Sequence, residues 1–152
     1  MSASSSSKES ESKSDGGVSS TSLGDGAMVR PIVVDWGKCM EQVCDDVTFL
    51  EEVMNDLLTE ALTARDEIDA AITAANYVAV TKAAHKVKGS ASYLYCGHLR
   101  LCAMSMQDLG QAINSAGTSN PETVEMMNGW FREYCLAYDN LCTEVKDHFN
   151  AK

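Results

Sequence analysis

Residues 85–92, HKVKGSAS, place a histidine, two lysines and a glycine within eight residues of a helical pattern. His85 is a candidate nucleophile because a neutral imidazole, abundant near pH 7, has a ring nitrogen whose lone pair can attack phosphorus. Lys88, one helical turn further, could contact phosphate oxygens as a flexible point charge. Gly89 costs about 1 kcal/mol relative to alanine in a helix interior. Close approach of a phosphoryl group to the bare backbone would explain that cost.

The helix that carries His85 is predicted over residues 77–96, because apolar residues recur there at spacings of three and four. At about 100° per residue, His85 lies roughly 140° from the centre of this apolar stripe, so we expect it to be exposed. Ser92 lies beside it, and Lys82 and Lys86 raise the local positive potential. A single exposed histidine ordinarily has no function, but the histidine, lysine and glycine together favour a site.

The same periodicity predicts an all-α domain, since strand-like alternation is nowhere sustained. Four long amphipathic helices with short connections pack most simply as an up-down-up-down four-helix bundle, and a short additional N-terminal helix caps one end. The first helix is predicted to begin after Asp35. The second spans 46–74, the third spans 77–96 and is ended by Gly97, and the fourth runs through 99–113. The fifth begins after Pro121.

The first thirty residues differ in composition from the rest of the chain. Residues 1–30 are rich in serine, glycine and acidic residues, so we expect a disordered leader, followed by a bundle domain over 31–152. A phosphorylated regulatory tail is the less favoured alternative for the leader. The net charge of −10 makes a nucleic-acid partner improbable, and the sequence contains no apolar run long enough for a membrane span.

Six cysteines are present, but no secretory segment precedes them and none forms a C-x-x-C pair. We therefore expect reduced thiols and a cytoplasmic protein, with the nucleus as a second location. A monomer is expected, because one four-helix core accounts for the main apolar stripes. No metal site is expected, since neither His98 nor His148 pairs with further ligands at metal-binding spacing.

The segment AHKVKGSAS resembles the H-x-x-K-G-[SA]-[SA] signature of histidine-containing phosphotransfer (HPt) domains, and MQDLG at 106–110 is similar to the eukaryotic phosphorelay members. The resemblance covers about residues 35–150. It implies that His85 accepts and donates the phosphoryl group, that Lys88 lies beside the phosphate and that Gly89 leaves space for it. Gln107 matches a position that in some members orients the imidazole, although a solvated surface glutamine is an equal alternative.

The resemblance also implies partners and a division of labour. The phosphoryl group would come from the receiver domain of a hybrid sensor histidine kinase and pass to the receiver domain of a response regulator. The receiver would supply a divalent cation, expected to be magnesium, and the chain would have no cofactor of its own. Because it lacks the acidic residue that follows the histidine in sensor kinases, and any Gly-rich nucleotide-binding segment, it should not phosphorylate itself from ATP. It departs from many members in having Tyr95 where they have glycine.

Apolar residues outside the long stripes are candidates for a receiver-docking surface. They lie in the first helix and at the start of the second, where packing of the short helix over them is an equal alternative. The predicted partner-binding residues are Met40, Val43, Phe49, Val53, Lys82, Lys86 and Ser92.

Two other functions compete with phosphotransfer. A non-phosphorylated helical adaptor could keep the same fold and bind receiver domains, but it would have no need for His85, Lys88 and Gly89 together. A metal or haem bundle would need paired ligands or a C-x-x-C-H element, which the sequence lacks.

Overall fold

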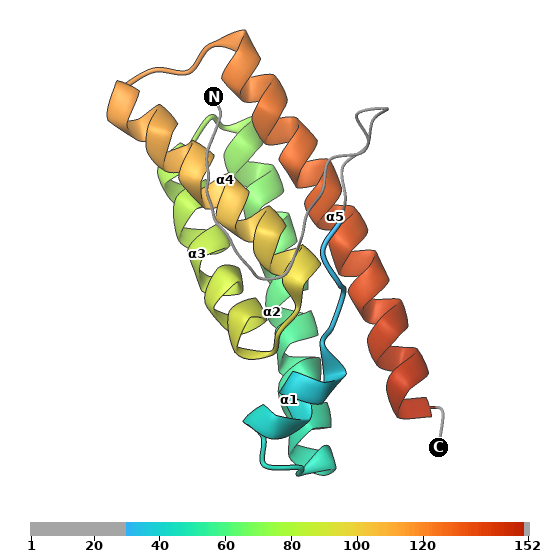
Figure 1. Cartoon of the computed structure of the whole chain (residues 1–152). Coiled ribbons are helices and arrows are strands. Elements are labelled where there is room, and N and C mark those ends of the chain that lie inside the picture. Colours follow the sequence, from blue (N-terminus) through green and yellow to red (C-terminus); the bar gives the residue numbers. More distant parts are fainter. Residues whose placement is uncertain (1–29, 151–152) are drawn as a thin grey trace, which may run out of the picture. The chain divides into compact units, whose positions relative to one another are not determined.

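The computed structural model describes residues 30–150, and the compact unit Ile32–Lys152 holds the helices found there. These are α1 (Trp36–Gln42), α2 (Val47–Thr73), α3 (Tyr77–Tyr93), α4 (Gly97–Ala116) and α5 (Pro121–Asn150), with no strand among the described residues. In Figure 1, α2 to α5 run alternately up and down, and α1 lies at the end where α2 begins. The predicted all-α bundle with a short N-terminal helix is confirmed. The predicted disorder of the leader concerns residues that lie, except for Arg30, outside the described range.

Polar side chains mark where most of the helices begin. Each accepts a hydrogen bond from a backbone N–H of the first turn, which has no partner within the helix. The acceptors at α1, α2 and α3 are Asp35, Asp46 and Asn76, which bond the N–H groups of Lys38, Phe49 and Ala79 at 3.2, 3.0 and 3.2 Å. Asn120 does the same ahead of α5, accepting from the Thr123 N–H at 2.9 Å. These local signals explain why the helix starts could be read from the sequence.

The link between α3 and α4 differs from the prediction. Gly97 does not end the third helix but is the first residue of α4, and α3 ends at Tyr93. The reversal is made by Tyr95, whose φ of 54° lies in the left-handed region where glycine is favoured. Its carbonyl oxygen accepts the backbone N–H of Asp35 at 3.1 Å, so this link also anchors the start of α1.

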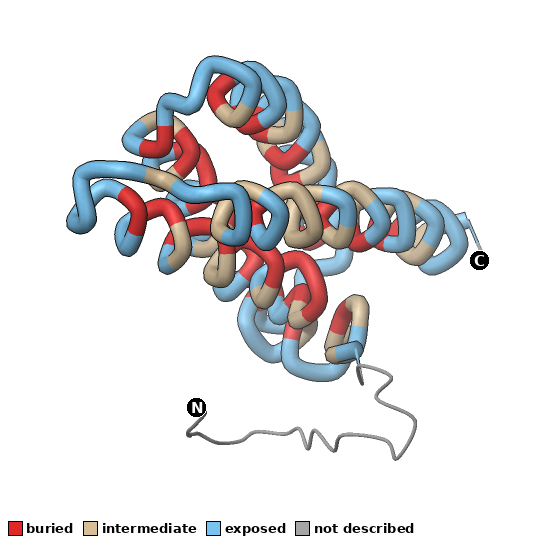
Figure 2. Tube along the Cα trace, turned by 90° about the horizontal axis from the view of Figure 1, so that it is seen from above, coloured by how far each residue is buried: buried red, intermediate tan, exposed pale blue. Residues whose placement is uncertain are grey.

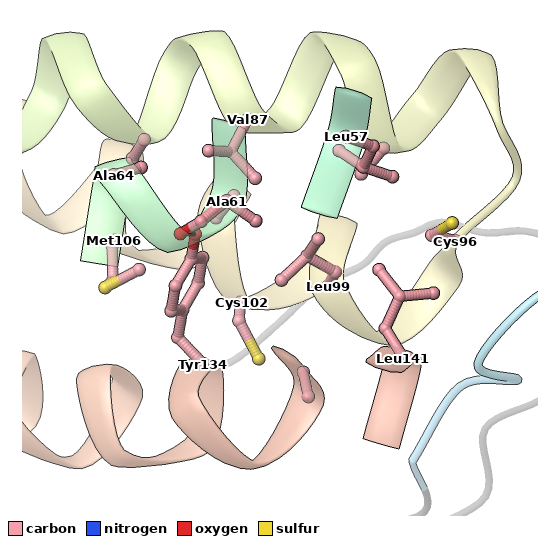
Figure 3. Packing of buried hydrophobic residues seen from close by; sticks show 14 of the residues in the cluster. Leu57, Ala61, Ala64, Val87, Cys96, Leu99, Cys102, Met106, Tyr134 and Leu141 are labelled. Carbon is pink, nitrogen blue, oxygen red and sulfur yellow. Dashed lines mark hydrogen bonds between the residues drawn. The ribbon is translucent and has the colours of Figure 1, made fainter. Parts of the chain in front are cut away.

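The core lies between the four long helices, and in Figure 2 the buried residues follow the inward sides of the tube. Tyr134 of α5 is fully buried, and its hydroxyl donates to the carbonyl oxygen of Ala61 in α2 at 2.7 Å. Figure 3 shows this ring among side chains of α3 and α4, including Val87 and Met106. The stripes predicted from periodicity therefore meet in one core, which holds α3 and α4 in a fixed arrangement.

The short helix α1 packs back onto the bundle, which changes the predicted docking surface. Val43 is only 6% exposed and belongs to the core, so it offers a partner no surface and is removed from that prediction. Met40 and Val53 are half-buried and pack against the core, whereas Phe49 remains 42% exposed. The alternative, that these residues pack within the protein, therefore holds for Val43 and in part for Met40 and Val53. A helix too short to be stable alone must bury its apolar side on the bundle.

All six cysteines lie in the described part of the chain, and no disulfide joins any two of them. None of the helices between residues 30 and 150 is long and apolar enough to cross a membrane.

Candidate functional site

His85 lies in the middle of α3 and is exposed, as the helical wheel predicts. Its ring is nevertheless held, because Nδ1 lies 3.2 Å from Nε2 of Gln107 in α4. Gln107 is only 8% exposed, so the alternative of a solvated surface glutamine is wrong. A buried amide and an exposed imidazole thus meet at the edge of the α3–α4 interface.

The Gln107 amide can serve either neutral form of the imidazole ring. Its NH₂ group donates to Nδ1 when that nitrogen has a lone pair. After a half-turn of the amide, its oxygen accepts from Nδ1–H instead. Gln107 Oε1 is buried and has no hydrogen-bond partner among residues 30–150, so it is available for the second arrangement. In both cases Nδ1 is engaged and Nε2 of His85 has no partner in the described chain. Nε2 has a free lone pair only in the second arrangement, in which the ring proton is on Nδ1.

Positive charge is concentrated around this ring. Residues 70–107 contain four cationic side chains and no aspartate or glutamate, although the chain as a whole carries a net charge of −10. Lys82 and Lys86 are exposed and Lys88 is half-buried. None of these three forms an ion pair with a described residue, so their ammonium groups are available to an incoming anion.

The fourth cation, Arg100, was not predicted as part of the site. It lies in α4, and its Nε donates to the hydroxyl oxygen of Ser92 in α3 at 3.1 Å. This contact places an exposed guanidinium beside Ser92, which was predicted to face a partner. The pairing of α3 with α4 brings the two residues together, and the sequence alone does not give its register.

Gly89 is exposed one turn beyond His85. A Cβ added at Gly89 would meet no atom of the protein within 4 Å. Packing inside the bundle therefore does not require glycine here. Glycine leaves open space outside the helix here, through which a partner or a ligand could approach the backbone.

A groove of about 990 Å³ borders the ring of His85. Lys82, Lys86 and Gln107 contribute to its walls, together with Gln111 and several alanines of α2 and α3. The small side chains of these alanines leave room for protruding atoms of a docked molecule. Glu67 of α2 also lines the groove, so the two lysines leave its lining with a net positive charge.

The other two histidines lie outside this site. His98 is 2% exposed, and its Nε2 lies 2.8 Å from Oε2 of Glu133 in α5, a contact between residues 35 apart that no sequence pattern announced. His148 stacks on Trp36, with ring centroids 3.6 Å apart. No group of three or more His, Cys, Asp or Glu side chains in residues 30–150 could hold a metal ion.

An all-α bundle with an exposed, oriented histidine on one helix is the architecture of a histidine phosphotransfer protein. A family model described as Hpt domain matches residues 52–148, well over half of the chain. The chain therefore belongs to the Hpt domain family, whose members are phosphotransfer carriers and not kinases. The match spans nearly all of α2 to α5 and includes both His85 and Gln107. Comparison with curated proteins and with solved structures gave no match.

Proposed function

We propose that this chain is the intermediate of a multistep two-component phosphorelay. His85 accepts a phosphoryl group from an aspartate in the receiver domain of a hybrid sensor histidine kinase and passes it to an aspartate in the receiver domain of a response regulator. The observation that carries the proposal is the arrangement at His85, an exposed ring whose Nδ1 is held by the buried Gln107.

The chemistry follows from that arrangement. The lone pair of His85 Nε2 attacks the phosphorus of the aspartyl phosphate, the new N–P bond forms, and the P–O bond to the aspartate breaks to release its carboxylate. For Nε2 to have the lone pair, the ring proton must be on Nδ1, where the Gln107 oxygen can accept it. Lys88 contributes positive charge next to the equatorial phosphoryl oxygens. Transfer to the second aspartate is the reverse sequence of bond changes.

The receiver completes the reaction centre. It brings the aspartate and a divalent cation, which we take to be magnesium, so the carrier needs no cofactor of its own and no ATP-binding segment. The cationic surface around His85 complements the negative charge of a phosphorylated receiver site. Such a carrier would work as a monomer in the cytoplasm, with the nucleus as a second location.

The test is transfer of label from a phosphorylated receiver to the purified chain. We expect acid-labile, base-stable label on the wild-type protein and none on the His85→Gln variant. His148→Gln is the matched control, because it removes another exposed helical histidine far along the chain and should be labelled like wild type.

Wild-type protein that stays unlabelled across several receivers would contradict the proposal. If it still bound those receivers, the chain would act as the non-phosphorylated adaptor instead. Equal labelling of the His85→Gln variant would place the phosphoryl group on another residue.

A further inference from the structure

Gly110 is buried in α4 where that helix faces α3. A Cβ added at Gly110 would lie 2.5 Å from Thr81 Oγ1 and 3.3 Å from the carbonyl oxygen of Tyr77, both in α3. The first distance is far inside the normal separation of non-bonded carbon and oxygen atoms. Any side chain at this position must therefore displace Thr81 or move the two helices apart.

Thr81 cannot turn away without cost. Its hydroxyl donates to the carbonyl oxygen of Tyr77 at 2.9 Å, and a β-branched side chain in a helix has few alternative rotamers. The Tyr77 oxygen belongs to the helix backbone and moves only with α3. A side chain at Gly110 would thus be felt as a change in the spacing of α3 and α4.

Two other helical glycines show that this restriction is specific to Gly110. A Cβ at Gly89 would meet nothing within 4 Å, and at Gly129 the nearest atom would be Nη2 of Arg132 at 3.9 Å, an ordinary contact. Of these three positions, Gly110 is the one where the neighbouring helix occupies the space of a side chain.

The contact at Gly110 is next to the contact that holds His85. Gln107 precedes Gly110 by three residues in α4, and His85 follows Thr81 by four in α3, so the two contacts lie one turn apart along the same antiparallel interface. The 3.2 Å separation of Gln107 Nε2 and His85 Nδ1 is at the long end for a hydrogen bond. A small increase in helix spacing would break it.

We propose that Gly110 is a positioning residue for His85, because its bare backbone sets the α3–α4 spacing at which the Gln107 amide reaches Nδ1. Its effect on phosphotransfer rests on the function proposed above, whereas the ring contact belongs to the free protein. Holding Nδ1 directs reaction to Nε2 and keeps the ring aligned for in-line attack.

The test reads the imidazole directly, by two-bond proton–nitrogen NMR spectra of protein labelled with ¹⁵N-histidine. We expect the Gly110→Ala variant to lose the wild-type His85 ring signals and to give those of a Gln107→Ala variant. Its transfer rate from a phosphorylated receiver should fall about tenfold, since small displacements of reacting groups cost one to two orders of magnitude. Gly129→Ala, the matched control, should keep both wild-type signals and rate.

Two double variants separate positioning from general damage. Removing the obstructing hydroxyl in the Gly110→Ala/Thr81→Ala variant should restore the wild-type ring signals and most of the rate. Adding Gly110→Ala to Gln107→Ala should shift the ring signals no further, because the contact is already absent.

Wild-type His85 signals in the Gly110→Ala variant would overturn the proposal. If that variant did not fold, the Gly110→Ala/Thr81→Ala protein would test the proposal instead. Wild-type ring signals in this double variant would support the proposal, and altered signals would contradict it. If the ring signals followed the expected pattern but wild-type protein accepted no phosphoryl group, the positioning role would stand and the proposed function would fail.

Discussion

His85 combines an exposed side chain with a ring that is held by a hydrogen bond. Exposure admits a receiver, and the bond from the buried Gln107 to Nδ1 restricts the ring without covering Nε2. Most of the orientation therefore exists before a partner arrives, which lowers the entropy that must be lost in reaching the transition state.

At this scale Lys88 should contribute to rate and not to stability. It forms no ion pair with a described residue, so the Lys88→Ala variant should unfold at the wild-type denaturant concentration. Loss of its charge beside the transferring group should slow phosphotransfer roughly tenfold, which corresponds to about 1.4 kcal/mol. The measurement is single-turnover transfer from a phosphorylated receiver, with Lys146→Ala on α5 as the matched surface control. Equal rates for wild type and Lys88→Ala would show that this lysine is only a solvated charge.

Gly89 should show the opposite combination of effects. Because a Cβ there has open space around it, Gly89→Ala should raise the free energy of unfolding by about 1 kcal/mol through helix propensity. Transfer should nevertheless slow, since the added methyl group meets the docking receiver. Gly129→Ala should gain similar stability without losing rate. Urea unfolding and transfer assays on both variants would check this, and a Gly89→Ala protein with wild-type transfer would remove the close-approach argument.

The residues around His85 could be predicted to different extents. The exposure of His85 follows from local periodicity alone. The wheel also placed Gln107 close to its own stripe but could not decide between surface and interface, because that depends on the register of α3 against α4. Arg100 beside Ser92 depends on the same register. The pairing of His98 with Glu133 joins residues of different helices and has no local signal.

At the scale of elements, the first three links between helices are short because one or two residues in the left-handed conformation reverse the chain, with Cys44 next to Asp45 in the first link. Asp45, Ala75 and Tyr95 occupy this region with φ of 64°, 56° and 54°, and none is glycine. Local capping signals made the starts of α1, α2, α3 and α5 predictable. The end of α3 was not predictable. Glycine is the residue expected in the left-handed position after a helix, which pointed to Gly97, but Tyr95 occupies that position. The backbone N–H of Asp35 also donates to the Tyr95 carbonyl oxygen, a tertiary bond that no local pattern predicts.

The α2–α3 link offers a stability test of this strain. Ala75 is exposed and left-handed, a conformation that costs a residue with a Cβ about 1 kcal/mol or more. Ala75→Gly should therefore raise the free energy of unfolding by up to about 1 kcal/mol. Part of this gain is offset by the larger conformational entropy of glycine in the unfolded chain. Ala74→Gly is the matched control. Its φ of −86° suits any residue, so glycine there should only destabilise. A lower midpoint for Ala75→Gly than for wild type in thermal or urea unfolding would contradict this account.

On the scale of the whole molecule, charge is divided between regions of the chain. Residues 70–107, the stretch that forms α3 and the first half of α4, carry a net charge of +4, whereas the rest of the chain carries −14. A receiver whose reaction centre is negative is thus repelled by most of the surface and attracted to the region of His85. Such a division favours association in one orientation and makes the association rate depend on ionic strength.

The core adds a dependence of stability on high pH. Cys39 and Cys96 are both fully buried, and each thiol approaches the carbonyl oxygen of Leu94, at 2.7 and 3.5 Å. Burial, with the charge of Asp35 adding to it, raises the pKa of Cys39 from 9.0 to about 11. Burial, with a smaller effect of Cys39, raises the pKa of Cys96 to about 12. The native protein therefore keeps both protons at a pH where the unfolded chain has lost them.

The sign of the effect follows from this difference in bound protons. Below pH 9 both states are protonated, so the free energy of unfolding does not change on account of these thiols. As the pH rises from 9 towards 11, the free energy of unfolding should fall by about 1.4 kcal/mol per pH unit for each thiol. Between pH 8 and pH 10 these two thiols should together lower the free energy of unfolding by about 3 kcal/mol, as measured by urea unfolding. A Cys39→Ala/Cys96→Ala variant should be less stable at pH 8, but its free energy of unfolding should fall much less between pH 8 and 10. A Cys44→Ala variant, changed at an exposed position, should show the same fall as the wild type. Equal losses in the double variant and the wild type would assign the alkaline sensitivity to other groups.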